Sequence, residues 1–257
     1  MLPDLVAGAR EDAATRRAHR SLATVEADAL GHEPALDALL QLAPADRVKI
    51  IAEVKRASPS RGPLADIPDP AALAVSYEAG GASAISVLTE GRRFGGSLAD
   101  LKAVHDAVTL PVLRKDFIVE PYQVFEARAA GADIVLLIVA ALELPLLAEL
   151  HSLVSGLGMT ALVETHSADE VSTALDIGAD LVGVNARNLT TFELDQNLFG
   201  SLADRIPSGV IRVAESAVTS PADVAHYRQA GADVVLVGEA LVTNGDPVAT
   251  LQQFLAS

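Results

Sequence analysis

From residue 48 onward, two patterns of apolar and polar positions alternate along the chain. Short runs such as residues 134–139 are apolar throughout, which is typical of parallel strands covered on both faces. Between them lie segments with helical spacing, several of which begin with an acidic or hydroxyl residue before proline, as in Asp69-Pro70 and Ser220-Pro221. The pattern therefore predicts eight strand–helix units in succession.

The boundaries of these units come from the ends of the apolar runs and from the capping residues. The predicted strands are residues 48–55, 83–89, 111–116, 133–139, 160–166, 181–187, 211–216 and 234–239. The predicted helices are residues 70–79, 97–107, 121–130, 142–156, 168–177, 198–204, 220–229 and 246–256. Ahead of them, the pattern predicts an amphipathic helix over 4–30 and a short helix at 35–42.

A Gly-Ala pair precedes every second predicted strand, at Gly81, Gly131, Gly178 and Gly231. The glycines are 50, 47 and 53 residues apart, and each is expected to end a helix. Eight such units fit a closed barrel, whereas an open doubly wound sheet usually has fewer repeats and a Gly-rich first turn, which is missing here. We therefore expect one α/β domain over 1–257, with a (β/α)8 TIM barrel at 48–257 and an N-terminal helical extension at 1–47.

Composition narrows the possible partners. Half of the residues are apolar but only 4% are aromatic, so the core must be mainly aliphatic. A formal net charge of −15 argues against binding to nucleic acid or to an anionic membrane surface. The absence of cysteine excludes disulfides and thiolate metal sites. Residues 1–20 have no apolar signal core, and the longest uncharged apolar run, 134–142, is too short to span a bilayer. We expect a cytoplasmic monomer that acts on a small molecule.

The predicted strands end on polar residues, and in a barrel the carboxyl ends of the strands carry the active site. Glu53 and Lys55 point to the same face of the first strand, about 7 Å apart. The chain has only four lysines against fifteen arginines, yet Lys55 and Lys115 both lie at strand ends. A lysine can lose its proton in such a setting and act as a general acid, whereas an arginine cannot. Other polar residues at strand ends are Glu90, Asp116, Glu164, His166, Asn185, Arg187, Glu215, Ser216 and Glu239.

Simpler interpretations exist for several of these residues. Glu53, Lys55 and Lys115 could form a structural ion-pair network. His166 is expected to be a loop or capping residue rather than a ligand, because a metal site with Glu164 lacks a third ligand at any suitable spacing. The pair Arg92-Arg93 is expected to be a solvated part of a loop.

Small-residue turns end the seventh and eighth predicted strands, at Glu215-Ser216-Ala217 and Gly238-Glu239. Barrels often bind phosphate at this position through backbone N–H groups. Gly238 would let the backbone approach closely, and the Ser216 hydroxyl could add a donor. For Glu239, the backbone N–H is expected to matter more than the carboxylate.

With these residues in view, the chain closely resembles the indole-3-glycerol-phosphate synthase family. The resemblance covers residue 48 to the end, and Lys-Arg-Ala-Ser-Pro-Ser together with Arg-Lys-Asp-Phe is its most specific combination. The stretches that carry it are 51–60, 86–90, 94–97, 112–118, 161–164, 183–189 and 214–216.

The resemblance implies that 1-(2-carboxyphenylamino)-1-deoxyribulose 5-phosphate closes to an indole with loss of carbon dioxide and water, without a cofactor or metal. It implies that Lys115 donates the proton for ring closure and that Glu164 is the acid/base of dehydration. Lys55 would pair with the substrate carboxylate, although the sequence does not settle which lysine acts at which step. Glu53 would orient Lys115 and Lys55 and, together with Asn185 and Glu215, hold the substrate hydroxyls. The implied binding residues are Phe94 and Phe117 for the anthranilate ring, and Ser58, Arg187, Ser216, Ala217, Gly238 and Glu239 for sugar and phosphate.

One departure from the family pattern concerns Ala217, where the family usually has glycine. A positive φ at this position would cost alanine about 1 kcal/mol or more. Two other functions fit the sequence less well. A phosphoribosylanthranilate isomerase normally uses an Asp and a Cys, and this chain has no Cys. A barrel kept only for binding would have little need of the carboxylates and lysines that are all present here.

Overall fold

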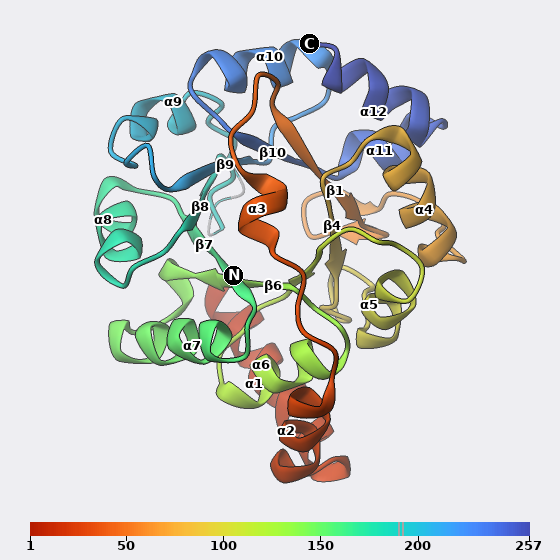
Figure 1. Cartoon of the computed structure of the whole chain (residues 1–257), viewed down its shortest axis with the longest axis vertical. Coiled ribbons are helices and arrows are strands. Elements are labelled where there is room, and N and C mark those ends of the chain that lie inside the picture. Colours follow the sequence, from red (N-terminus) through yellow and green to blue (C-terminus); the bar gives the residue numbers. More distant parts are fainter. Residues whose placement is uncertain (190, 192) are drawn as a thin grey trace.

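The computed structural model describes residues 1–189, 191 and 193–257. Among these residues, eight parallel strands close into a barrel with helices outside it (Figure 1), which confirms the predicted (β/α)8 TIM barrel. The first strand of the barrel pairs with both the last and the second, and so completes the ring. In chain order the strands are β1 (Lys49–Val54), β4 (Ala84–Leu88), β5 (Val112–Lys115), β6 (Ile134–Ile138), β7 (Thr160–Thr165), β8 (Leu181–Asn185), β9 (Ile211–Glu215) and β10 (Val234–Val237).

A helix follows each strand, and hydroxyl or acidic side chains cap several of them. Ser97, Ser167, Asp69 and Asp246 each accept a hydrogen bond from a backbone N–H in the first turn of a helix. The helices are α4 (Pro70–Gly80), α5 (Leu98–His105), α6 (Pro121–Ala129), α7 (Leu144–Gly156), α8 (Ala168–Asp176), α9 (Leu198–Ala203), α10 (Pro221–Gln229), the short α11 (Glu239–Thr243) and α12 (Pro247–Leu255). The pattern did not predict the 3-10 turn η1 (Val139–Ala141) or the small hairpin of β2 (Ala57–Ser58) and β3 (Gly62–Pro63).

Strand alternation divides the core into two layers. Ile50 and Ala52 of β1 pack outward against the helices, whereas Ile51 packs inside the barrel with Leu113 and Leu162. Residues two positions further along β1, β5 and β7 share this inward face, and they are the polar residues at the strand ends. The same alternation that fills the barrel with aliphatic side chains therefore points the polar ends into its mouth.

The prediction of one helix over 4–30 is wrong. The segment forms α1 (Leu2–His19) and α2 (Leu22–Gly31), because the chain is extended at Arg20 and Ser21 and the Ser21 hydroxyl caps the second helix. Arg16 of α1 is paired with the buried Glu126 of α6 at 2.7 Å, which ties the extension to the barrel.

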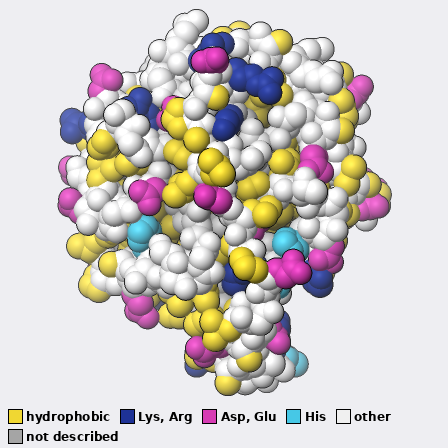
Figure 2. Space-filling model, in the orientation of Figure 1, with side chains coloured by type: hydrophobic (Ala, Val, Ile, Leu, Met, Phe, Trp, Pro, Cys, Tyr) yellow, Lys and Arg dark blue, Asp and Glu magenta, His cyan; other side chains and the backbone are white. Residues whose placement is uncertain are grey.

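The short helix α3 (Ala38–Leu42) lies across the end of the barrel where the strands begin, opposite their carboxyl ends (Figure 1). There Ala38 and Leu42 join the interior core. On this face, hydrophobic side chains lie between scattered charged ones (Figure 2), and Leu40 is among the exposed apolar residues. In the described part of the chain, no helix combines the length and apolar character needed to cross a membrane.

Candidate active site

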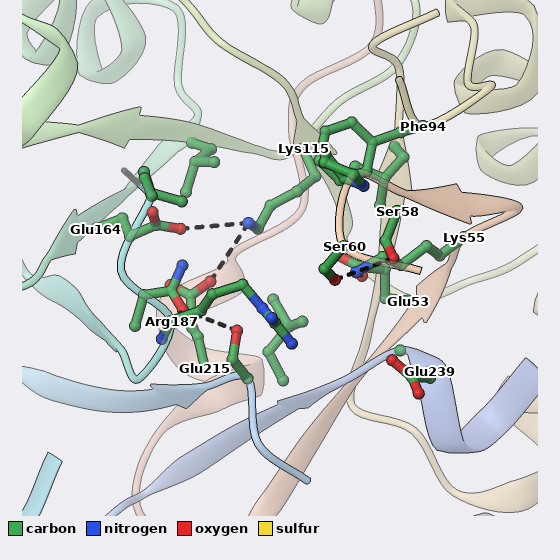
Figure 3. A pocket seen from close by; sticks show the side chains of 18 of the residues that line it. Glu53, Lys55, Ser58, Ser60, Phe94, Lys115, Glu164, Arg187, Glu215 and Glu239 are labelled. Atoms are coloured by element: carbon green, nitrogen blue, oxygen red, sulfur yellow. Dashed lines mark hydrogen bonds and ion pairs between the residues drawn. The ribbon is translucent and has the colours of Figure 1, made fainter. Parts of the chain in front are cut away.

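A cavity opens at the carboxyl ends of the strands. It contains about 1240 Å³ of empty space, a volume that includes the open solvent at its mouth. Its lining contains every residue that the sequence singled out as catalytic or binding, contributed by strand ends and the loops that follow them (Figure 3). These residues are Glu53, Lys55, Ser58, Phe94, Lys115, Phe117, Glu164, Asn185, Arg187, Glu215, Ser216, Ala217, Gly238 and Glu239.

Lys115, at the end of β5, reaches between the carboxyl groups of Glu164 on β7 and Glu215 on β9 (Figure 3). Its Nζ lies 3.3 Å from Oε2 of Glu164 and 3.5 Å from Oε2 of Glu215. Burial lowers the pKa of Lys115, but the negative charge of Glu164, followed by that of Glu215 when Glu215 is ionised, outweighs burial and holds this pKa above its ordinary value. The lysine is therefore a protonated ammonium at neutral pH.

The two carboxylates beside Lys115 have pKa values pushed in opposite directions. Burial, and next the charge of Glu164, raise the pKa of Glu215 to about 8. Burial also acts to raise the pKa of Glu164, but the positive charges of Lys115 and His166 outweigh it and bring this pKa below its usual value. At neutral pH the Lys115 ammonium thus lies between the carboxylate of Glu164 and the carboxylic acid of Glu215. Such a separation is the usual mark of an acid/base site.

On the other side of the cavity, Lys55 lies beside an acid and an aromatic ring. Its Nζ is 3.4 Å from Oε1 of Glu53 and 5.8 Å from the centre of the Phe94 ring. Phe94 and Phe117 are 6.5 Å apart between ring centres. The Ser86 hydroxyl donates to the other carboxylate oxygen of Glu53 at 3.4 Å. A cation beside one aromatic ring, with a second ring nearby, suits a ligand that carries both a carboxylate and an aromatic ring.

The side-chain oxygen of Asn185, at the end of β8, accepts two hydrogen bonds, one of which comes from the residue after β9. The Ser216 hydroxyl donates to Oδ1 of Asn185 at 2.8 Å, and the backbone N–H of Arg187 donates to the same oxygen at 3.0 Å. Ser216 and Ala217 both adopt positive φ, 69° and 56°. The positive φ considered for Ala217 is therefore present, and the one at Ser216 was not foreseen.

The turn after β10 approaches the side chain of Glu53. A Cβ on Gly238 would lie 2.6 Å from Oε1 of Glu53, so only glycine fits there without displacing that carboxylate. The carboxylate of the next residue, Glu239, is paired with Arg61 at 2.7 Å. Sequence reasoning did not single out Arg61, although it directly follows the specific Lys-Arg-Ala-Ser-Pro-Ser motif.

Among described residues, no group of three or more His, Asp or Glu side chains could hold a metal ion.

Other side chains whose role the sequence did not settle also make contacts. His166 lies in the loop before α8, as expected, but it also contacts Glu164. The interpretation of Arg92 as merely solvated is incomplete, because its guanidinium donates to Asp12 and Glu11 of α1 at 2.7 and 2.9 Å. α1 also supplies Leu5 to the cavity lining. These contacts tie α1 to the mouth of the barrel.

The comparisons by sequence point to one family. The sequence model of one family, described as indole-3-glycerol phosphate synthase, matches residues 2–254. An indole-3-glycerol phosphate synthase of Leifsonia xyli subsp. xyli is 74% identical, over 99% of this chain and 97% of its own. One of Beutenbergia cavernae is 58% identical, over 100% of this chain and 95% of its own.

Solved structures of lower identity share the fold alone. A 3-hexulose-6-phosphate synthase is 20% identical with a TM-score of 0.64, over 81% of this chain and 99% of that chain. A thiamine phosphate pyrophosphorylase from Pyrococcus furiosus is 15% identical with a TM-score of 0.59, over 80% of this chain and 93% of that chain.

Proposed function

The chain belongs to the indole-3-glycerol phosphate synthase family, and from that premise we propose which residues at the mouth of the barrel act in each step of the reaction. The family closes 1-(2-carboxyphenylamino)-1-deoxyribulose 5-phosphate to indole-3-glycerol phosphate, with loss of carbon dioxide and water, in tryptophan biosynthesis. The enzyme is thus a decarboxylating lyase.

Lys115 is the proton donor for ring closure. A carbon of the aryl ring attacks the ribulose carbonyl, and the carbonyl oxygen must receive a proton as the new bond forms. The observation that carries this assignment is the position of the Lys115 ammonium between Glu164 and Glu215, where the charge of Glu164 keeps it protonated and both groups hold its Nζ in the cavity. Lys55 is the alternative donor, and single substitutions of the two lysines distinguish them.

Glu164 carries the proton transfers of dehydration. After decarboxylation a proton must leave the ring system and the hydroxyl must leave as water, which calls for a group that accepts and then returns a proton. Glu164 is a buried carboxylate in contact with Lys115, and so it is poised to take part in both steps. Glu215, protonated at neutral pH, and Asn185 hold substrate hydroxyls.

The ends of the substrate bind on different sides of the mouth. Lys55 pairs with the substrate carboxylate while Phe94 and Phe117 flank the aromatic ring, which the cation–ring geometry supports. In a chain of net charge −15, an anionic substrate needs such local cations. The phosphate side is formed by Arg187, Ser58, the Ser216 hydroxyl and the backbone at Ala217, Gly238 and Glu239.

The proposal also covers the state of the protein. We expect a monomeric, cytoplasmic enzyme without a nucleic-acid partner, and one domain over 1–257. The shared interior core of Leu5, Leu42 and the barrel strands supports a single domain. Light scattering after gel filtration measures the oligomeric state directly.

The function is tested by adding the carboxyphenylamino-deoxyribulose phosphate to the purified protein and following indole fluorescence. Turnover to an indole product is expected. Binding without any product would favour a barrel kept only for binding. Turnover of phosphoribosylanthranilate instead would favour the isomerase.

A further inference from the structure

Two buried polar atoms without a hydrogen-bond partner face each other just behind the cavity. They are Oε1 of Glu164 and Nε2 of His166, which lie 3.5 Å apart. The other carboxylate oxygen of Glu164 already accepts a hydrogen bond from Lys115. An unpaired buried polar atom is costly, and a proton on Nε2 would satisfy both atoms at once.

The other side of the His166 ring is held by Glu170 at the start of α8. Nδ1 lies 3.2 Å from Oε2 of Glu170, and the His166 backbone N–H donates to the same oxygen at 2.7 Å. The Ser167 hydroxyl accepts from the backbone N–H of Glu170 and so fixes this turn. The imidazole is therefore fixed between two carboxylates, one on each ring nitrogen.

The charges around the ring favour its protonated form. Glu164 faces it from β7, Glu170 from α8 and the Lys115 ammonium from β5, whereas η1 (Val139–Ala141), packed against α8, has no titratable side chain. Burial lowers the pKa of His166, but the two carboxylates outweigh burial and Lys115 and raise this pKa above its ordinary value.

We propose that His166 is a positioning residue for Glu164, acting as an imidazolium that donates from Nδ1 to Glu170 and from Nε2 to Glu164. The proposal rests on the role assigned to Glu164 above. With Oε1 held by the ring, only Oε2 is free to exchange between Lys115 and the substrate. The positive charge also lowers the pKa of Glu164, so that Glu164 stays ionised down to a lower pH than it would without the imidazolium. His166 does not line the cavity, so it acts through Glu164 and not on the substrate.

The first test is the pH profile of His166→Gln, which removes the charge but keeps a polar side chain. Because the imidazolium favours the carboxylate of Glu164, its loss moves the acidic limb of kcat/KM to higher pH, by about one unit. We expect kcat to fall roughly tenfold on the acidic side, as one pH unit implies, with KM nearly unchanged. His19→Gln, the same change at an exposed histidine of α1, is the control and should leave the profile in place. An acidic limb that stays at its original pH in His166→Gln overturns the proposal.

A second measurement does not depend on activity or on the stability of His166→Gln. The His166 ring is titrated by NMR in the full chain and in Glu164→Gln and Glu170→Gln. Each variant removes one negatively charged neighbour of the ring, so the ring should titrate at lower pH in both variants. Identical titration in all three proteins would show that the ring does not interact with Glu164 and would end the proposal. If the wild-type protein turns over no substrate, the proposed function fails, while the NMR titration still reports on the His166–Glu164 pair.

Discussion

The Nζ of Lys115 lies 3.3 Å from Oε2 of Glu164, so the proton donor proposed for ring closure touches the acid/base proposed for dehydration. Their contact couples the two steps, because any change in the charge of one alters the pKa of the other. A carboxylate next to the ammonium keeps the donor charged, and the ammonium keeps the carboxylate ionised. Substrate binding between them would separate the pair at the moment when each is needed.

Lys115→Met is expected to lower kcat by about 10²- to 10⁴-fold, the range typical of a lost general acid. Substrate binding should change little, since other residues hold the carboxylate and phosphate. Indole fluorescence measures turnover, and calorimetry with the substrate measures binding. Lys102→Met, at an exposed lysine of α5, is the matched control. Unchanged turnover in Lys115→Met would remove Lys115 from the chemistry.

Glu215→Gln is expected to stabilise the folded protein in a pH-dependent way. Burial and Glu164 raise the pKa of Glu215 to about 8, so the folded state resists an ionisation that the unfolded chain undergoes near its ordinary pKa. The cost to wild-type stability is absent at acidic pH, grows as pH rises toward 8 and is constant above it. Thermal unfolding of both proteins between pH 4 and 9 should therefore show a gap that widens and then levels off, by about 2–4 °C for each kcal/mol.

The control for this series is Glu149→Gln, on the exposed face of α7. It should give the same small difference at every pH. A constant gap for Glu215→Gln would mean that Glu215 is ionised in the folded protein. Activity should fall in Glu215→Gln in either case, because its contact with Lys115 changes.

The position of the site could be predicted from the sequence because strand alternation carries the information. Ile51 and Glu53 share a face, and a barrel leaves that face only two environments, a packed interior and an open mouth. The same holds for Leu113 with Lys115. Apolar runs that end on a polar residue at an inward position thus identify the lining before any coordinates are known.

Contacts between side chains from distant loops could not be predicted in this way. The pairing of Arg61 with Glu239 depends on how a two-stranded hairpin folds over the mouth, and nothing in local sequence periodicity specifies it. The contact of His166 with Glu164 depends on a rotamer rather than on strand parity. The break in the first predicted helix is marked in the sequence only by Ser21, and helical spacing on both sides of it does not show that Ser21 caps a second helix.

Ala217→Gly is expected to relieve backbone strain next to the proposed phosphate site. Ala217 has φ 56°, a left-handed conformation that costs a residue with a Cβ about 1–2 kcal/mol and costs glycine little. We expect kcat to stay nearly the same and KM to fall by up to about fivefold, since about 1 kcal/mol corresponds to that factor. Steady-state kinetics at fixed pH measures both. An unchanged KM would show that strain at this turn does not limit phosphate binding.

Gly238→Ala is expected to disturb catalysis more than folding. The new Cβ would lie 2.6 Å from Oε1 of Glu53 and 3.3 Å from its Cβ, so the carboxylate that pairs with Lys55 must move. Because the obstructing oxygen is at the end of a flexible side chain, we expect a loss of stability of about 1–3 kcal/mol. A displacement of about 1 Å in an active site can cost about 10²-fold in rate, so kcat/KM should fall by 10- to 100-fold.

The matched control for Gly238→Ala is Gly156→Ala, an exposed position at the end of α7 where a Cβ would meet nothing within 4 Å. It should retain full activity and gain slightly in stability, because alanine favours the helix over glycine. Unfolding temperature and kcat/KM are measured for both variants. Full activity in Gly238→Ala would mean that Glu53 can leave its observed position without consequence, and its assignment as the group that orients Lys55 and Lys115 would then be wrong.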